Sequence, residues 1–364
     1  LAEQHYLKLK AWLEPLGVAV AWLTGRLTGK ARQTLLERLT AGEIHIAVGT
    51  HALFQESVTF AELALAIVDE QHRFGVHQRL ALREKGRAGG RCPHQLIMTA
   101  TPIPRTLAMS AYADLDTSTI DELPPGRQPV RTVVVPDGRR DEVIERIRRA
   151  CRAGRQAYWV CPLIEESEVL QCQAAAVTAE RLTAILPELR IGLAHGRRSA
   201  AEREAAMTAF KAGELDLLVA TTVIEVGVDV PNASLMVIEH AERFGLAQLH
   251  QLRGRVGRGA KASVCVLIYT APLSDTGKAR LKAMVETTDG FEIARRDLEI
   301  RGPGEFMGSR QSGAELLRFA DLQEDAPLLQ TARKLAPMLL ERHPAAAQAQ
   351  IQRWLGTKAE FLKA

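Results

Sequence analysis

The chain of 364 residues contains no long hydrophobic run. Its longest apolar stretches, such as Leu63 to Val68, are far too short to cross a bilayer. No charged and then apolar segment opens the chain, so a secretion signal is not expected. These absences predict a cytoplasmic protein with no membrane partner. Residue 1 is Leu rather than Met, from which we expect a fragment or a processed product.

Cysteine is also scarce, and its spacing excludes the common zinc patterns. The five cysteines are odd in number, and no pair has C-x-x-C spacing. Cys92 and His94 lack the second half of any zinc site. Cys161 and Cys265 lie inside apolar runs and are expected to be small core residues. We therefore predict reduced thiols and no metal site built from cysteine.

A phosphate-binding loop of the form G-x-x-x-x-G-K-[ST] is missing as well. The segment Gly25-Arg-Leu-Thr-Gly29-Lys30-Ala31 comes near this pattern but is one residue short. It also ends in Ala, which leaves no hydroxyl for Mg²⁺. We interpret it as a loop before a helix, so these residues alone are not expected to hold a nucleoside triphosphate.

The amino-acid composition of the chain is typical of a globular protein. Hydrophobic residues make up 46% and charged residues 25% of the chain. The formal net charge of +4 is mildly basic, which is compatible with a phosphate-backbone partner but is weak support for one.

Short apolar runs alternate with amphipathic stretches, which predicts parallel α/β sheets. The segment Leu123 to Val130 holds three prolines and a glycine and is the predicted linker between two such sets. The predicted strands are 44–48, 63–68, 96–98, 132–135, 157–161, 191–194, 215–220, 235–238 and 264–269. The predicted helices are 31–39, 141–152, 175–186, 200–211 and 278–286, followed from residue 289 by a glycine-rich stretch and a polar helical tail.

Two neighbouring acids stand where one strand is predicted to end. Asp69 and Glu70 follow the apolar run Leu63 to Val68, and ligands bind at the carboxyl ends of strands in α/β sheets. One carboxylate there can hold Mg²⁺ while the next orients or deprotonates an attacking water. A bare Asp-Glu is equally common in a charged turn after a strand, so the pair alone does not decide between a site and a turn.

A second string resolves that choice in favour of a site. Met98-Thr-Ala-Thr-Pro-Ile-Pro-Arg105 combines hydroxyl side chains with two prolines in a stiff loop after another apolar run. Together with Asp69-Glu70-Gln71-His72, it resembles motifs II and III of the superfamily 2 helicases, which are ATP-driven motors on nucleic acids. The resemblance implies that Asp69 and Glu70 form the Mg²⁺ site, with Glu70 as the base, and that Gln71 and His72 contact the nucleotide.

The most specific string in the chain is Gln251-Leu-Arg-Gly-Arg-Val-Gly-Arg258. Its glycines allow a close backbone approach, while Arg255 and Arg258 present planar forks suited to phosphate oxygens. A solvated basic helix end is the alternative, which the regular spacing of arginine between glycines disfavours. The string resembles motif VI of the same helicases. The resemblance implies that Arg255 and Arg258 are arginine fingers for the γ-phosphate and that Gln251 binds the nucleotide.

The remaining assignments rest on the same resemblance. Val219 to Pro231 resembles motif V, which places Thr221 on the nucleic-acid backbone and Gly227 and Asp229 at the nucleotide ribose. Several short loops are expected to donate hydrogen bonds from backbone N–H and hydroxyl groups to DNA phosphates. Each of these loops is by itself weak support for a DNA contact. These candidate residues are Thr24, Gly25, Thr50, His51, Thr99, Thr101, His195 and Gly196.

Within the superfamily, the strings Asp69 to Val76 and Asp121 to Gly126 resemble the RecG family. The tail string Gly290 to Gly308, with Gln311 after it, resembles a translocation motif that RecG shares with the transcription-repair coupling factor. There a helical hairpin and loop link ATP hydrolysis to movement on duplex DNA, which implies a coupling role for Arg301 and Gln311. The missing phosphate loop departs from the family, where it lies upstream of the segment matching Leu1.

We therefore predict an α/β protein with two RecA-like parallel-sheet lobes in tandem, the first incomplete, and an α-helical C-terminal extension. The predicted boundaries are 1–126, 127–288 and 289–364. The implied function is the motor of an ATP-dependent double-stranded DNA translocase or helicase that uses ATP and Mg²⁺. It would remodel branched DNA, such as stalled forks and Holliday junctions, in recombination and repair.

The predicted partner is branched duplex DNA, and a single-stranded-DNA-binding protein is an open second partner. A monomer is expected. Two alternatives remain: a transcription-repair coupling motor, and a non-catalytic DNA-binding fragment. Because the phosphate loop is missing, the chain alone is expected to lack ATPase activity.

Overall fold

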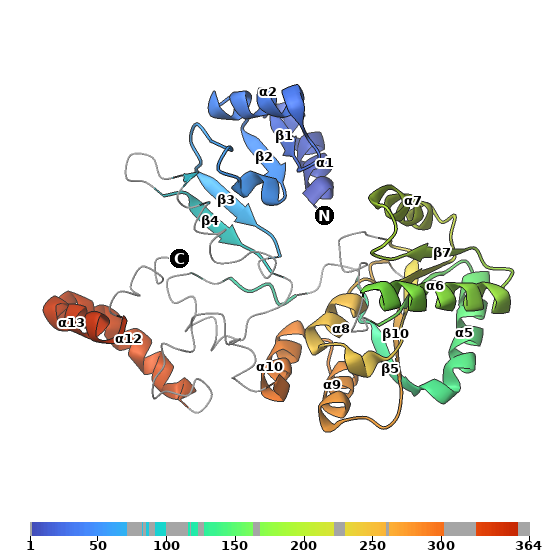
Figure 1. Cartoon of the computed structure of the whole chain (residues 1–364). Helices are drawn as coiled ribbons and strands as arrows, with labels where there is room; N and C mark the ends of the chain where they lie inside the picture. The colour runs from blue at the N-terminus through green and yellow to red at the C-terminus, as the bar shows by residue number, and fades with distance from the viewer. Residues whose placement is uncertain are drawn as a thin grey trace. The chain divides into compact units, whose positions relative to one another are not determined.

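The computed structural model describes residues 2–70, 82, 85–86, 92–99, 116, 118–122, 127–162, 168–221, 230–259, 262–301 and 325–355. Its contacts divide the chain into two compact units, residues 1–100 with 343–364 and residues 101–342. Both units contain parallel strands and helices, as predicted (Figure 1). The domain boundaries expected at residues 126 and 288 remain predictions. Among the described residues, no helix has the length and apolar character needed to span a membrane.

The first unit begins with a helix and a pair of strands. Strand β1 (Val20–Leu23) pairs in parallel with β2 (Ile46–Gly49), and α1 (Ala2–Leu13) packs against both strands. Tyr6 of α1 stacks on Trp22 of β1, with ring centroids 5.6 Å apart. Helix α2 (Gly29–Thr40) buries Leu36 and Leu39 on one face. Short helices η1 (Glu14–Leu16) and η2 (His51–Phe54) complete this part.

A second pair of parallel strands in this unit is formed by β3 (Leu65–Val68) and β4 (His94–Ile97). Ala66 and Val68 are buried in a small cluster with Leu82, whereas Leu65 and Ile67 are 52% and 57% exposed. The apolar run 63–68 predicts a strand buried on both faces, and this expectation is wrong for one of them. The reason is that β3 and β4 form a two-stranded sheet in the described structure, and only one face of that sheet is covered.

The second unit is built on a six-stranded sheet with strand order β5-β10-β9-β6-β8-β7. All of the described pairings in it are parallel. The strands are β5 (Arg131–Pro136), β6 (Gln156–Val160), β7 (Ile191–Ala194), β8 (Leu217–Ala220), β9 (Ala233–Ile238) and β10 (Val264–Tyr269). All six match predicted strands, because in a sheet covered on both faces each strand is a nearly continuous apolar run.

Helices cover the two faces of this sheet, and alternate residues along each strand divide between them. Tyr158 and Val160 of β6 belong to one core, while Ala157 and Trp159 belong to the other. The second core includes residues of α5 (Arg140–Arg152) and α6 (Glu168–Ile185). The first includes residues of α7 (Ala200–Lys211), α8 (Leu246–Arg253), α9 (Asp275–Glu286) and α10 (Gly290–Arg301). Short helices are η4 (Asp137–Arg139) and η6 (Ala241–Arg243).

The predicted helical extension is confirmed by α10, α12 (Ala326–Arg342) and α13 (Pro344–Leu355). Helix α10 is not merely a solvated charged helix. Arg295 and Glu299 are exposed and form an ion pair, but Asp297 is only 4% exposed. Helix α10 packs against both α8 and α9. The helix that follows the second sheet is therefore part of the core of this unit.

Candidate functional site

In the first unit, the predicted DNA-contact residues follow paired strand ends. Leu23 at the end of β1 is in register with Gly49 at the end of β2, so Thr24 and Thr50 leave the same edge of that sheet. Thr24 Oγ1 accepts a hydrogen bond of 3.0 Å from Arg26 N, which shapes the turn containing Gly25. Thr50 and His51 are exposed. The structure thus groups these residues at one sheet edge.

The acid pair also lies at a carboxyl edge. Asp69 and Glu70 directly follow β3, and both are half-buried. Asp69 Oδ1 accepts a hydrogen bond of 2.9 Å from Glu70 N, and Glu70 has a φ of 56°. A left-handed backbone is uncommon for a residue other than glycine and is enriched at functional sites. The local turn therefore fixes the direction of the Asp69 carboxylate and the backbone conformation of Glu70.

One partner of this pair, His5, was not among the predicted site residues. His5 of α1 lies with its Nε2 3.3 Å from Asp69 Oδ2. The two residues are 64 positions apart, and no motif contains both. Helix α1 packs against β1 and β2, so the fold brings His5 to the acid pair. A hydrogen bond to one carboxylate oxygen restricts the orientation of a carboxylate that can act as a metal ligand.

The donor set of the acid pair fits Mg²⁺. Carboxylate oxygens are the hard ligands that this ion prefers, and it commonly takes one or two from protein together with substrate phosphates. Among the described residues, no group of three or more His, Cys, Asp or Glu could hold a metal by itself. Asp69 and Glu70 could therefore contribute ligands to a nucleotide-bound Mg²⁺ and would not form a complete metal cage.

The hydroxyl-rich loop that contains the candidate DNA-contact residue Thr99 begins beside the acid pair. Val68 and Ile97 are in register, and Met98 N donates a hydrogen bond of 2.8 Å to Val68 O. Thr99 follows directly and is half-buried. The start of this loop and the acid pair therefore leave neighbouring strands at the same edge, as the parallel-sheet interpretation predicted.

In the second unit, two predicted DNA-contact residues come together in the same way. His195 follows β7 and Thr221 follows β8, whose last residues Ala194 and Ala220 are in register. Thr221 N donates a hydrogen bond of 3.3 Å to Ala194 O, and Thr221 is only 3% exposed. Gly196 completes the turn after His195.

The electrostatic environment of His195 favours its neutral form. Burial lowers the pKa of His195, and the nearby Arg198 and Arg197 lower it further. Its Nδ1 is buried and, in the part of the chain that the structure describes, has no hydrogen-bond partner. A neutral imidazole beside two arginines places donor groups at this sheet edge, as a phosphate contact requires.

The arginine-rich string forms the end of α8 and a tight loop after it. Val256 is fully buried, which fixes the middle of the loop in the core. Gly257 has a φ of 81°, and a Cβ there would lie 2.7 Å from Val130 Cγ2. A Cβ at Gly259 would collide with Pro231 O. Only glycine fits such positions, and the packed loop presents Arg255 as half-buried and Arg258 as exposed.

Six of the predicted site residues lie outside the described residues: Gln71, His72, Thr101, Gly227, Asp229 and Gln311. Arg301 is the last residue of α10, although its side chain is not among those described. Gln251 lies in α8, half-buried and one turn before Arg255.

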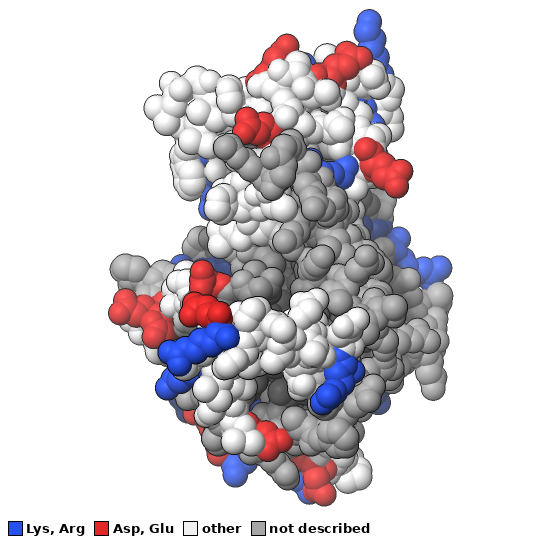
Figure 2. Space-filling model, turned by 90° about the vertical axis from the view of Figure 1, so that its left-hand side faces the viewer, with Lys and Arg blue, Asp and Glu red and all other residues white. Residues whose placement is uncertain are grey.

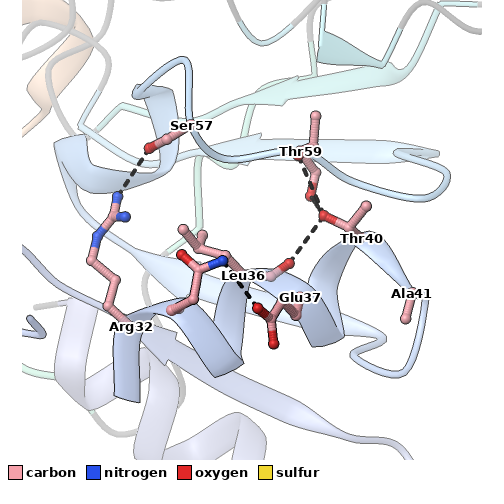
Figure 3. Close-up of a pocket in the computed structure, with 8 residues that line it drawn as sticks. Arg32, Leu36, Glu37, Thr40, Ala41, Ser57 and Thr59 are labelled. Carbon is pink, nitrogen blue, oxygen red and sulfur yellow. Dashed lines mark hydrogen bonds between the residues drawn. The ribbon is translucent and has the colours of Figure 1, made fainter. Parts of the chain in front are cut away.

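A shallow groove on the first unit lies along α2 and is lined by residues of this helix together with Ala41, Ser57 and Thr59 (Figure 3). Arg32 Nη2 on one side donates to Gln55 Oε1 at 2.7 Å and to Ser57 Oγ at 3.2 Å. Thr40 Oγ1 on the other side donates to Leu36 O at 3.0 Å. Because these polar groups already satisfy one another, nothing in the groove converges on a ligand, and we assign it no role.

Three family models match the chain. They are the DEAD/DEAH box helicase over residues 1–110, the helicase conserved C-terminal domain over 140–260, and domain 3, C-terminal, of the ATP-dependent DNA helicase RecG over 287–357. The ATP-dependent DNA helicase RecG of Escherichia coli strain K12 is 62% identical over 356 residues, which cover 98% of this chain and 51% of that protein. The Bacillus subtilis strain 168 protein of the same name is 50% identical over 93% of this chain and 49% of its own length.

A solved structure of RecG bound to a three-way DNA junction is also similar. It shares 44% sequence identity and a TM-score of 0.68, over 90% of this chain and 42% of that chain. The chain thus spans about half the length of the curated relatives that it matches.

Both units have a parallel α/β fold, and two of the matched models, which together cover most of residues 1–260, describe helicases in general. The chain belongs to the RecG family of ATP-dependent DNA helicases. These matches confirm the predicted fold class and do not support the alternative of a transcription-repair coupling motor.

Proposed function

We propose that this chain supplies the motor of an ATP-dependent double-stranded DNA translocase that remodels branched DNA. One observation carries the proposal. An acid pair at a strand end in one unit and a packed arginine-rich loop in the other occur in a chain 62% identical to a RecG helicase. ATP and Mg²⁺ are the proposed cofactors, branched duplex DNA is the proposed partner, and the cytoplasm is the proposed location.

The acid pair supplies the hydrolytic chemistry in this proposal. Asp69 holds Mg²⁺, and Glu70 orients or deprotonates the attacking water. The hydrogen bonds of Asp69 with Glu70 N and His5 Nε2 fix the direction of its carboxylate. Gln71 and His72, which follow in sequence, contact the nucleotide.

The second unit supplies charge stabilisation. Arg255 and Arg258 direct their guanidinium groups at the transferred phosphoryl group, where developing negative charge is stabilised. Gln251, Gly227 and Asp229 bind the nucleotide from the same unit. The buried Val256 between the two arginines supports this role, because a fixed loop positions donors in advance of the reaction.

DNA contact is assigned to the loops at the carboxyl edges of the strands and not to bulk surface charge. On the face shown in Figure 2, basic and acidic side chains of the described residues are interspersed and form no continuous basic stripe. The proposed backbone contacts in the first unit are Thr24, Gly25, Thr50, His51, Thr99 and Thr101, and those in the second are His195, Gly196 and Thr221. Arg301 and Gln311 couple hydrolysis to movement.

Any active protein needs a phosphate-binding loop in addition to these 364 residues, because the sequence contains none. A chimera provides one. The 356 aligned residues of this chain would replace their counterparts in the Escherichia coli K12 RecG, which are 62% identical. At that identity the core residues that meet across the join are expected to be largely compatible.

The test is the ATPase rate of the chimera with a three-way junction, compared with linear duplex at equal base-pair concentration. We expect greater stimulation by the junction. Equal stimulation by linear duplex would contradict the branched-DNA assignment, and DNA binding without any ATPase would favour a non-catalytic binding role.

A further inference from the structure

Arg253 is a buried cation in the middle of the arginine-rich string, and the proposed chemistry does not use it. It is only 3% exposed. Its Nη1 donates hydrogen bonds to Thr132 Oγ1 at 3.2 Å, Met284 O at 2.8 Å and Thr287 O at 2.9 Å. Its Nη2 lies 2.9 Å from His250 Nδ1. One guanidinium therefore bridges α8, the edge strand β5 and the end of α9.

All four of these acceptors are neutral groups, and that is unusual for a buried charge. Burial lowers the pKa of His250 to about 4, with a further contribution from Arg253, so the imidazole is neutral and its Nδ1 accepts the hydrogen bond. Burying a cation against neutral acceptors has a large desolvation cost, and a hydrophobic side chain of similar volume would avoid it. A hydrophobic residue could not replace Arg253 in one respect, since it has no planar set of N–H donors to bind several acceptors at once.

The acceptors at Met284 and Thr287 mark the corner between α9 and α10. Thr287 ends α9 in extended conformation, with φ −139° and ψ 147°. Thr287 Oγ1 accepts from Asp289 N at 3.0 Å, and Asp289 Oδ1 accepts from Phe291 N at 2.8 Å in the first turn of α10. Arg253 thus binds the first carbonyl of a short connection that two further hydrogen bonds shape before α10 begins.

The other side of the arginine-rich loop is fixed by the segment before β5. Arg127 Nη2 donates to Gly254 O at 3.3 Å, and Val130 fills the space beside Gly257. The loop is held on this side by packing and on the other by Arg253. Loss of the guanidinium would loosen both the loop and the α9–α10 corner, because Arg253 is the last residue of α8 before the loop and its guanidinium binds the end of α9.

We infer that Arg253 is a positioning residue, whose guanidinium fixes Arg255 and Arg258 relative to the α9–α10 corner so that loop and corner move as one. The inference rests on the proposed function for the roles of those two arginines. The mechanical link itself involves only contacts within the second unit, so it can be tested without any activity.

The first test is amide hydrogen exchange on the 364-residue chain. Arg253→Lys keeps the positive charge but loses the planar set of guanidinium donors. Thr132→Val removes one acceptor with little change in side-chain volume. Arg152→Gln is the matched control, because Arg152 is exposed on α5 and pairs with Glu188 at the surface. We expect Arg253→Lys to accelerate exchange about tenfold or more in both 254–259 and 287–293, with a smaller change in Thr132→Val. Strands β7 and β8 should be unchanged.

Acceleration in only one of the two segments, or equal acceleration throughout the sheet, would overturn the inference. Should Arg253→Lys fail to fold, the milder Thr132→Val must still change both segments together, and no change in either would also overturn the inference.

The second test is kinetic and uses the chimera. Arg253→Lys should lower kcat about tenfold or more while changing the KM for ATP by less than about threefold. The reason is that displacement of Arg255 and Arg258 weakens their contacts in the transition state more than the binding of ATP in the ground state. An unchanged kcat per folded molecule would show that Arg253 is only structural. If the unsubstituted chimera has no ATPase, the proposed function fails, and the exchange experiment alone decides the positioning role.

Discussion

A histidine that stays neutral well below physiological pH lies beside the arginine-rich loop. Burial is the main cause of the lowered pKa of His250, and the positive charge of Arg253 is the second; Asp289 acts in the opposite direction. In the unfolded chain the imidazole has an ordinary pKa near 6.5. Protonation would place a second positive charge against the guanidinium of Arg253 and remove the acceptor at Nδ1.

This difference predicts a pH-dependent loss of stability. As pH falls below about 6.5, the unfolded chain takes up a proton that the folded chain does not accept until about pH 4. Stability should therefore be fully present above about 6.5 and fall by about 2 to 3 kcal/mol by about pH 4. His250→Gln keeps an acceptor and cannot titrate. Urea unfolding between pH 4 and 7 should show a shallower pH dependence in that variant.

His195 also has a lowered pKa and contributes to the same window. The difference between the parent chain and His250→Gln isolates the His250 contribution. Parallel stability curves for the two proteins would contradict the burial and charge account of His250.

Part of the candidate site could be predicted from sequence because its residues are local. Asp69 and Glu70, or Arg255 and Arg258, stand within a few positions of each other, and the chemistry of such a group can be recognised from spacing alone. His5 could not be predicted, since its contact with Asp69 depends on the packing of α1. Arg253 stood in the recognised string, but its burial depends on the ends of α9 and β5.

At the scale of elements, the two units differ in how completely their sheets are covered. In the first unit, the described strands form two separate pairs, and Leu65, Ile67 and Leu96 of β3 and β4 are each about half exposed. In the second, β6, β8 and β9 are buried throughout. Exposed apolar side chains contribute little to folding, and unpaired strand edges leave backbone groups without partners in the sheet.

We therefore predict that the first unit opens more readily than the second. Limited proteolysis of the 364-residue chain should leave a resistant core that contains the six-stranded sheet from β5 to β10. Mass spectrometry of the product would identify it. A resistant core confined to residues before 100 would contradict the prediction, as would a chain cleaved at equal rates in both units.

The elements of the second sheet could be predicted because a covered parallel strand is a continuous apolar run. In the first unit, α1 and β1 were not predicted. Val20–Leu23 is short, and its neighbours give no alternation that distinguishes it from a loop. Helix α8 (Leu246–Arg253) was also missed, because only its last three residues were interpreted, as the start of the arginine-rich string.

At the scale of the whole molecule, the proposed motor converts ATP hydrolysis into movement on DNA. In the chimera, Arg301→Ala or Gln311→Ala should leave most of the DNA-dependent ATPase intact and impair junction unwinding much more. The physical reason is that residues at the end of α10 and after it can transmit motion without touching the phosphates. The measurement is the ratio of unwinding rate to ATPase rate at saturating forked DNA.

A ratio equal to that of the unsubstituted chimera would contradict the coupling role. Weaker DNA affinity, with both rates restored by additional DNA, would instead indicate a binding role. Loss of thermal stability would indicate a structural role, and the exposed Arg295→Gln on the same helix serves as the control.

The most direct test of the account is ATP turnover by the chimera with saturating junction DNA. The unsubstituted chimera should hydrolyse ATP, while the 364-residue chain alone should not, because it has no phosphate-binding loop. Glu70→Gln should still bind ATP with Mg²⁺ but turn it over slowly, since the amide keeps the shape and loses the base. Arg258→Ala should lower kcat about 10³-fold. Near-normal kcat in both variants would contradict the assignment of the acid pair and the arginine-rich loop to the chemistry of a DNA motor.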